Sequence, residues 1–322
     1  TLDQDLPTPY QGIGARGVNN LAAKLLLTLF PPNSPFFKFQ IDDFTLQELQ
    51  AQRAPIEEGL NAMERAVMDE VEAKAMRVPL NECLRHLIIT GNCLLHANKN
   101  NKVRVFHLDQ YCVRRDPQGE MLEVIVLEKM SRELYKDVFD SAPPNETGDS
   151  SDSQEKQLNL YTVVRRKDNK IHVHQEVNNK KIPNTDSTYP LDKNPWLPLR
   201  FSSIDGEDYG RGFVEEYLGD LRALEGLSKA ILEGSAAAAR AIFLVRPNGT
   251  TKLKTISQAP NLAVRQGSAE DVTVLQMQKF NDFRVAQETI NQTERRLAAA
   301  FMLNQSVQRD AERVTAEEIR FL

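Results

Sequence analysis

Apolar residues return at every third or fourth position along residues 212–240, which is the period of an α-helix. The chain approaches this segment through turn residues, with Asp205 and Gly206 followed by Gly210, Arg211 and Gly212. The pattern predicts one helix of about 28 residues and about 42 Å, longer than most helices of compact domains. The length of this helix therefore calls for an explanation in the architecture of the protein. Its periodic positions are Val214, Tyr217, Leu218, Leu221, Leu224, Leu227, Ile231 and Leu232.

The same period predicts further helices elsewhere in the chain. Pro31 and Pro32 end the first of them, because proline has no backbone N–H to donate, and Gly91 ends the third. These helices are expected at 15–30, at about 55–71, at 79–90 and at 281–303. Their apolar stripes are Val18, Leu21, Ala22, Leu25 and Leu29; Leu60, Met63, Val67 and Val71; and Phe283, Ala286, Ile290, Leu297 and Phe301.

Between the helices, short runs rich in β-branched and aromatic residues predict strands. A hairpin is expected at residues 167–170, and residues 141–157 indicate a flexible excursion because they carry almost no core-forming side chains. Residues 241–280 predict a small α/β or β-rich insert between two helices, which must therefore project away from the 1–205 body. The strands are expected at 93–97, 103–108, 111–115, 122–127, 158–166, 171–177 and 197–202.

Composition limits the class of protein. The chain has 322 residues, is 41% hydrophobic and carries a formal net charge of −5, so it can form a core but has no strongly basic surface for gripping nucleic acid. Three cysteines, Cys83, Cys93 and Cys112, fit a reducing compartment better than a disulfide scaffold. No run reaches the roughly 18 apolar residues of a membrane span.

Two T-x-x-E capping boxes mark helix starts, at Thr45 with Glu48 and at Thr315 with Glu318. The second box opens a helix that stops at residue 322 after about two turns without a stop signal. We therefore expect further sequence beyond the ends of this chain.

Residues 12–17 read GIGARG and fit the G-x-G-x-x-G pattern of dinucleotide-binding turns. That function requires a preceding strand and an acidic residue on a second strand about 20 residues later. The preceding segment is not a hydrophobic strand, and Asp42 and Asp43 lie in a loop-like stretch. A flexible turn that starts a helix is the better interpretation, and an intracellular nucleotide-binding enzyme remains an alternative.

Two Cys-x-x-His pairs, Cys83 with His86 and Cys93 with His96, have spacing that some zinc sites use. The first pair lies in a helical pattern and the second in a strand, where residues three apart point to opposite faces. We therefore expect no metal site, and we expect His172 and His174, which share a strand face, to serve packing or the surface. No motif for ATP hydrolysis, for a serine nucleophile or for a metalloprotease is present, so no catalytic residue and no cofactor are predicted.

Three blocks resemble one family. Residues 205–225 (DGEDYGRGFVEEYLGDLRALE), 300–320 (AFMLNQSVQRDAERVTAEEIR) and 12–23 (GIGARGVNNLAA) are similar to the portal, or head-to-tail connector, proteins of short-tailed phages in the autographivirus group. The blocks occur in the order found in the family and span nearly the whole chain. Only the middle, about 130–185, departs from the family in length and composition.

The resemblance implies an α+β portal fold with an α/β wing, a two-helix stem and a small inserted clip, and without the C-terminal crown. It places the wing at 1–205 (helices, then β-rich), the first stem helix at 206–240 and the clip at 241–280. The second stem helix follows at 281–303, the tunnel loop at 304–314 and the start of the next, truncated helix at 315–322.

The implied function is that of a non-enzymatic subunit of a ring at one capsid vertex. About twelve copies would form the channel for DNA packaging and ejection, in a virion assembled in the host cytoplasm. The implied partners are further copies of the chain, double-stranded DNA without sequence specificity, a terminase motor, a tail adaptor, and the scaffolding and major capsid proteins, with no membrane. A monomeric scaffold or adaptor protein is a second alternative.

Candidate site residues follow from this resemblance and from the distribution of charge. Acidic residues outnumber basic ones over 207–240, and such a wall with sparse basic rings would let DNA pass, because each neutralised phosphate tightens binding. The DNA-facing candidates in the tunnel loop and stem are Arg309, Arg313, Lys229 and Arg240. The candidates for docking partners on the clip are Arg246, Lys252, Lys254 and Arg265.

Overall fold

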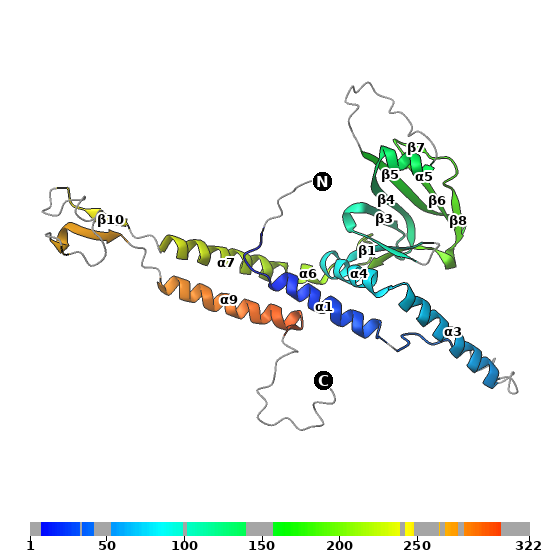
Figure 1. The fold of residues 1–322 in the computed structure, drawn as a ribbon, viewed down its shortest axis with the longest axis horizontal. Coiled ribbons are helices and arrows are strands. Elements are labelled where there is room, and N and C mark those ends of the chain that lie inside the picture. The colour runs from blue at the N-terminus through cyan, green and yellow to red at the C-terminus, as the bar shows by residue number, and fades with distance from the viewer. Residues whose placement is uncertain are drawn as a thin grey trace, which may run out of the picture. The chain divides into compact units, whose positions relative to one another are not determined.

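The computed structural model is drawn in Figure 1. It falls into two units: a sheet body, Val18–Tyr217, and a helical unit formed by Thr1–Gly17 with Leu218–Leu322. Within the part of the chain that is described, no helix is long and apolar enough to cross a membrane. The structure describes residues 8–32, 34–41, 53–98, 102–139, 157–238, 242–247, 264, 268–275 and 280–303.

Helices form near the predicted ranges, with one addition. The unpredicted helix is α5, which places Tyr135 in a small core with Leu158, Leu160, Val177 and Ile182. The helices and their bounds are α1 (Ile13–Leu29), α3 (Arg53–Ala73), α4 (Arg77–Thr90), α5 (Arg132–Phe139), α6 (Phe213–Glu216), α7 (Leu218–Ala238) and α9 (Phe280–Ala300). Short 3-10 helices lie at Leu108–Gln110, Leu191–Lys193 and Ala269–Asp271.

The prediction of one continuous helix over 212–240 is wrong. The helix is interrupted at Tyr217, whose φ of −106° and ψ of 8° leave the helical region. The Tyr217 N–H donates to the carbonyl of Val214 at 3.1 Å, so this turn closes three residues back instead of four. The short helix α6 packs on α4, and α7 begins afresh after the break.

A six-stranded antiparallel sheet forms the larger part of the sheet body. Strands follow the order β3-β4-β5-β6-β7, and β8 pairs with residues 170–173 of β6, away from the residues 176 and 177 that pair with β7. The hairpin predicted at 167–170 is confirmed, with Asp168 and Asn169 at φ of 51° and 61°, a left-handed conformation that Asp and Asn tolerate. The strands are β3 (Tyr111–Arg115), β4 (Met121–Ser131), β5 (Gln157–Lys167), β6 (Lys170–Val177), β7 (Lys180–Lys181) and β8 (Ser187–Pro190).

A second antiparallel sheet, in the order β2-β1-β9, faces the same core. Its strands are β1 (Asn92–Ala97), β2 (Val103–Phe106) and β9 (Trp196–Arg200). The alternating residues Val124, Val126 and Val164 are 0% exposed and pack with Leu94 of β1 and with Trp196 of β9. Burial of these side chains supplies most of the driving force for joining the two sheets.

The helical unit is built on α7 and α9, which pack side by side and antiparallel (Figure 1). Leu224, Leu297 and Phe301 are fully buried in this unit, and an ion pair of 3.1 Å joins Asp220 of α7 to Arg296 of α9. Between the two helices, β10 (Ile242–Val245) pairs with β11 (Val272–Leu275), as expected for a β-containing insert. The rest of 241–280 is largely outside the described residues.

Candidate functional site

Within the sheet body, the chain enters α6 at a junction made by Gly91, Asn92, Gly210, Arg211 and Gly212, which we call the glycine junction. A Cβ atom at Gly91 would lie 2.3 Å from the carbonyl carbon of Arg211, and one at Gly212 would lie 2.5 Å from the oxygen of Ile89. Gly91 also has a φ of 75°, in the left-handed region that follows a helix. The two backbones can therefore meet only because no side chain stands between them.

Asn92 joins the two segments of the glycine junction through its side chain. Its Nδ2 donates to the carbonyl oxygen of Gly210 at 2.9 Å, and its Oδ1 accepts from the Gly210 N–H at 2.7 Å. The same Nδ2 donates to the oxygen of Thr90 at 2.8 Å. Asn92 is only 3% exposed, so these bonds replace water that the amide has lost. The amide thus pairs with Gly210 as a neighbouring strand would.

Arg115, at the end of β3, fixes the loop that leads into the junction. Its backbone N–H donates to Oδ1 of Asp208 at 2.6 Å, and its Nε donates to the Asp208 carbonyl at 3.0 Å. Its other guanidinium nitrogens donate to the carbonyls of Gly119 and Pro198 at 2.9 and 2.7 Å. Burial lowers the pKa of Arg115, and the nearby positive charge of Arg200 lowers it further.

Tyr209 adds a second contact to β3, because its hydroxyl oxygen accepts from the Val113 N–H at 3.2 Å. Arg211, in contrast, is exposed and bridges Glu207 and Glu215 at 3.0 and 2.8 Å, and these hydrogen bonds raise its pKa. Such exposed pairs contribute little stability. Sequence reasoning identified the glycines as turns but missed the contacts of Asp208 and Tyr209 with β3.

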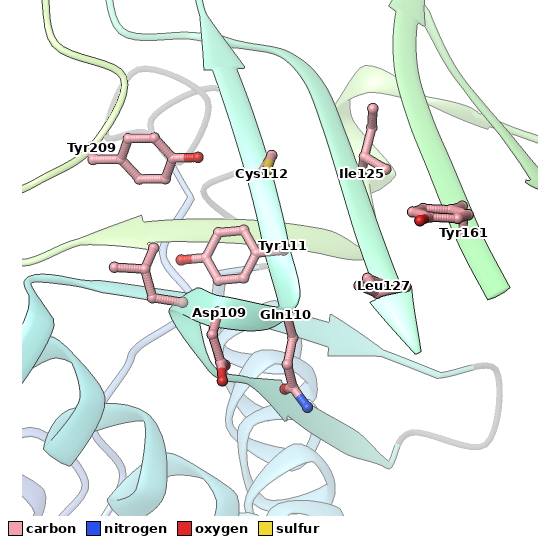
Figure 2. Close-up of a pocket in the computed structure, with 9 residues that line it drawn as sticks. Asp109, Gln110, Tyr111, Cys112, Ile125, Leu127, Tyr161 and Tyr209 are labelled. Carbon is pink, nitrogen blue, oxygen red and sulfur yellow. The ribbon is translucent and has the colours of Figure 1, made fainter. Parts of the chain in front are cut away.

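A partly open cavity of about 360 Å³ lies beside this loop, on the outer face of the large sheet (Figure 2). Cys112 stands opposite Ile125 on the neighbouring strand, and Leu127 stands opposite Tyr161. The surface is mainly apolar and carries the phenol groups of several tyrosines. Burial raises the pKa of both Tyr111 and Tyr209, which keeps them neutral. The lining is Leu108, Asp109, Gln110, Tyr111, Cys112, Ile125, Leu127, Tyr161 and Tyr209.

The GIGARG segment does not form a phosphate-binding turn. Helix α1 begins at Ile13, two residues earlier than predicted, so Gly14 and Gly17 lie inside it, and residues 8–12 form no strand. A Cβ at Gly17 would lie 2.6 Å from Cγ of Phe301, and one at Gly14 would lie 3.3 Å from Cδ2 of Leu221. These glycines therefore admit neighbouring side chains instead of a pyrophosphate.

Cys93 and His96 diverge, as expected for residues three apart in a strand. Cys93 is buried with Cys83 and Leu95, whereas His96 lies on the other face of β1, stacked on Trp196 at 3.8 Å. A hydrogen bond with Cys83, together with burial, raises the pKa of Cys93. His174 is 2.9 Å from Glu176, and His172 is 3.5 Å from Thr188. Among the described residues, no three metal-ligating side chains converge.

Two of the predicted channel and docking residues are described. The Lys229 ammonium group lies 3.9 Å from the Glu233 carboxylate and 5.9 Å from the centre of the Tyr10 ring. Arg246 is exposed, and its N–H donates to the Asp271 carbonyl at 2.9 Å. Outside the described residues lie Arg240, Lys252, Lys254, Arg265, Arg309 and Arg313, most of the 141–157 excursion, and the capping boxes at Thr45 and Thr315.

A family model described as "Bacteriophage head to tail connecting protein" matches residues 3–322. The chain belongs to this family. The resemblance indicated by the three sequence blocks is therefore confirmed, as is the predicted combination of helices and sheets.

Individual relatives agree with the family match. The chain is 38% identical over 325 residues to the portal protein of Enterobacteria phage T3 and 35% identical over 326 residues to that of Escherichia phage T7, with 99% of this chain covered in both. It spans 61% of the length of each of these relatives. Among solved structures, a chain from the neck of a native gene transfer agent particle, determined with C12 symmetry, aligns with a TM-score of 0.44 at 13% identity, covering 96% of this chain and 70% of that chain.

Proposed function

We propose that this chain is part of a subunit of the ring-shaped portal vertex of a phage capsid. The observation that carries the proposal is the match to head-to-tail connecting proteins over residues 3–322, together with 38% identity to the portal protein of phage T3. In this function the ring, of about twelve copies, lies at one vertex of the virion. It forms the channel for DNA packaging and ejection. It also serves as a platform for head assembly, a terminase motor and a tail adaptor.

The division into wing, stem and clip is part of the same proposal. Residues 1–205 form the wing, 206–240 and 281–303 the two stem helices, and 241–280 the clip. The tunnel loop is 304–314, and residues 315–322 begin the next helix. The glycine junction supports this division, because it fixes the start of α6 to α4 and β1 through Asn92 and through close backbone contacts.

We place Arg309, Arg313, Lys229 and Arg240 at the DNA channel. Lys229 is the weakest of these candidates, because Glu233 and the Tyr10 ring already engage its charge. Replacing Arg309 and Arg313 with alanine should leave ring assembly intact and impair late packaging or retention of DNA. Normal filling and retention in the double variant would remove these two arginines from the channel.

We place partner docking on the clip, with Arg246, Lys252, Lys254 and Arg265 as its basic residues. Charges at the rim of an interface mainly accelerate association. Lys252→Glu with Lys254→Glu should therefore slow the docking of the motor or adaptor, most at low salt, and spare ring formation. Wild-type docking rates in low salt would refute this placement.

The structural role requires no bound cofactor and no catalytic step of its own, so ATP hydrolysis would belong to the separate motor. Native mass spectrometry and negative-stain electron microscopy of the purified chain test the central claim. We expect closed rings of about twelve copies at micromolar concentration. A protein that stays monomeric under these conditions would overturn the proposed function.

A further inference from the structure

One face of α7 is left exposed by the described residues of the helical unit. It lies opposite Leu224, the fully buried residue at the contact with α9. Ala223, Gly226 and Ala230 lie on this side and are exposed. A Cβ added at Gly226, or at Gly219 one heptad earlier, would meet nothing within 4 Å. Small side chains here would let another helix approach closely, since interhelical distance depends on the side chains at the contact.

Two charges border this face, Lys229 and Glu233, which are four residues apart and exposed. On α9, Arg284 and Glu288 are also four residues apart and exposed, on the side away from the buried Ile290 and Leu297. The order of charge along each helix is therefore basic then acidic on α7, and basic then acidic on α9. Because the two helices run in opposite directions, these orders are complementary when the helices lie side by side.

The register that brings these charges together is the one the molecule already uses. Within one copy, Asp220 pairs with Arg296, and the backbone of Gly234 lies against the ring of Phe283. At the same register, Glu233 falls opposite Arg284 and Lys229 falls opposite Glu288. In the same register Arg222 falls opposite Arg295, and the adjacent Glu294 offsets part of this like-charge repulsion.

A rotation about an axis parallel to the helices leaves every residue at its own height. If the ring axis runs along α7 and α9, the α7 helix of one copy and the α9 helix of the next therefore meet in the register found within a copy. We propose that the exposed face of α7 packs against the exposed face of α9 from the next copy in the ring. This contact pairs Lys229 with Glu288 and Glu233 with Arg284 of the neighbour.

This inference rests on the ring of the proposed function and names the surface that closes it. Each α9 then lies between two α7 helices, so the contact is head-to-tail and closes on itself around the ring. It also gives the Lys229 ammonium group a carboxylate partner in a neighbouring copy.

Charge reversal tests the pairing. Glu233→Lys and Arg284→Glu should each raise the protein concentration needed for half-maximal ring assembly at least about tenfold in low salt, because each places like charges together. The double variant should return to near the wild-type concentration. Asp137→Lys, on the exposed surface of α5, is the control with the same change in charge as Glu233→Lys and should assemble normally.

A size change provides a second, independent test. Gly226→Leu favours the α7 helix by propensity but fills the space that the neighbour needs, so we expect a folded protein that assembles poorly. Assembly is measured by mass photometry across a dilution series, and folding by circular dichroism.

The outcomes separate this contact from the proposed function. A wild-type chain that forms no ring refutes the ring itself. A wild-type ring with normal assembly of Glu233→Lys, Arg284→Glu or Gly226→Leu refutes this contact alone, as does a charge-swapped double variant that assembles no better than the single ones.

Discussion

Gly17 lies directly against the ring of Phe301, so close that a Cβ at position 17 would be 2.6 Å from Cγ of the ring and 2.9 Å from its Cβ. Phe301 is fully buried and directly follows α9, while Gly17 lies on the second turn of α1. The absence of a side chain at one residue therefore allows the other to close the end of the helical unit.

Gly17→Ala should reduce the free energy of unfolding by about 1–2 kcal/mol. The added methyl group forces Phe301 to move, which costs about 1–3 kcal/mol, and the better helix propensity of alanine offsets part of this cost. Urea denaturation monitored by circular dichroism measures the change. Gly12→Ala is the control, because a Cβ there meets nothing within 4 Å. Equal stability of both variants would contradict the packing role of Gly17.

Asn92→Asp should destabilise the glycine junction by about 2–3 kcal/mol at pH 8. The carboxylate still accepts from the Gly210 N–H but cannot donate to the carbonyls of Gly210 and Thr90. Protonation restores one donor, so the loss should shrink as the pH falls towards 5. Asn159→Asp, at an exposed position on β5, should show neither effect. Denaturant titrations of both variants at the two pH values make the comparison.

Arg115→Lys should cost about 1.5–3 kcal/mol, because an ammonium group cannot reach the carbonyls of Asp208, Gly119 and Pro198 together. Arg114→Lys, next to it and exposed, should change stability by less than about 0.5 kcal/mol. Hydrogen exchange gives a local readout: the amide of Val113, which donates to Tyr209, should exchange faster only in the Arg115 variant. Unchanged exchange there would mean that Arg115 does not hold the loop.

We expect His96 to reduce the free energy of unfolding in mild acid. Burial, followed by the charge of Arg104, lowers its pKa from the ordinary value of 6.5, and its Nδ1 is buried without a partner. As the pH falls below about 6.5, the unfolded chain binds this proton before the folded one does, so the stabilisation present above that pH is lost. His96→Phe keeps a ring against Trp196 and should lose less stability between pH 7.5 and 5.5. The pKa of His86 is lowered as well, so some dependence should remain. A variant with the wild-type slope would exclude His96 as a source.

Sequence patterns located the elements whose signals are local. The bounds predicted for β3, 111–115, are those of the structure, and the 167–170 hairpin needed only its two turn residues to be identified. The apolar stripe of 281–303 likewise predicted α9, with Ile290, Leu297 and Phe301 buried as expected. In each case the residues within the element determine whether it forms a helix, a strand or a hairpin turn.

What the sequence did not predict depends on residues far apart in the chain. Apolar periodicity continues through Tyr217 without a gap, and the break there accompanies the packing of α6 on α4. Asn92 and Gly210 are separated by 118 positions, and neither has a neighbour in sequence that reveals the pair. Gly17 matches a nucleotide-binding pattern because the pattern specifies only the positions of glycines. It does not specify that Gly17 makes room for the ring of Phe301. The cavity around Cys112 was missed because apolar residues on both faces of β3 and β4 predict burial equally.

The contacts of Asp208 and Tyr209 with β3 also protect the protein from its own sheet. An edge strand with free N–H groups can recruit a strand from another molecule and start aggregation. Here the Val113 and Arg115 N–H groups of the edge strand β3 are already occupied, and at the opposite end β7 has two residues, both lysines. The β3 edge and the two-residue β7 therefore offer few free N–H groups to a strand from another copy of the chain.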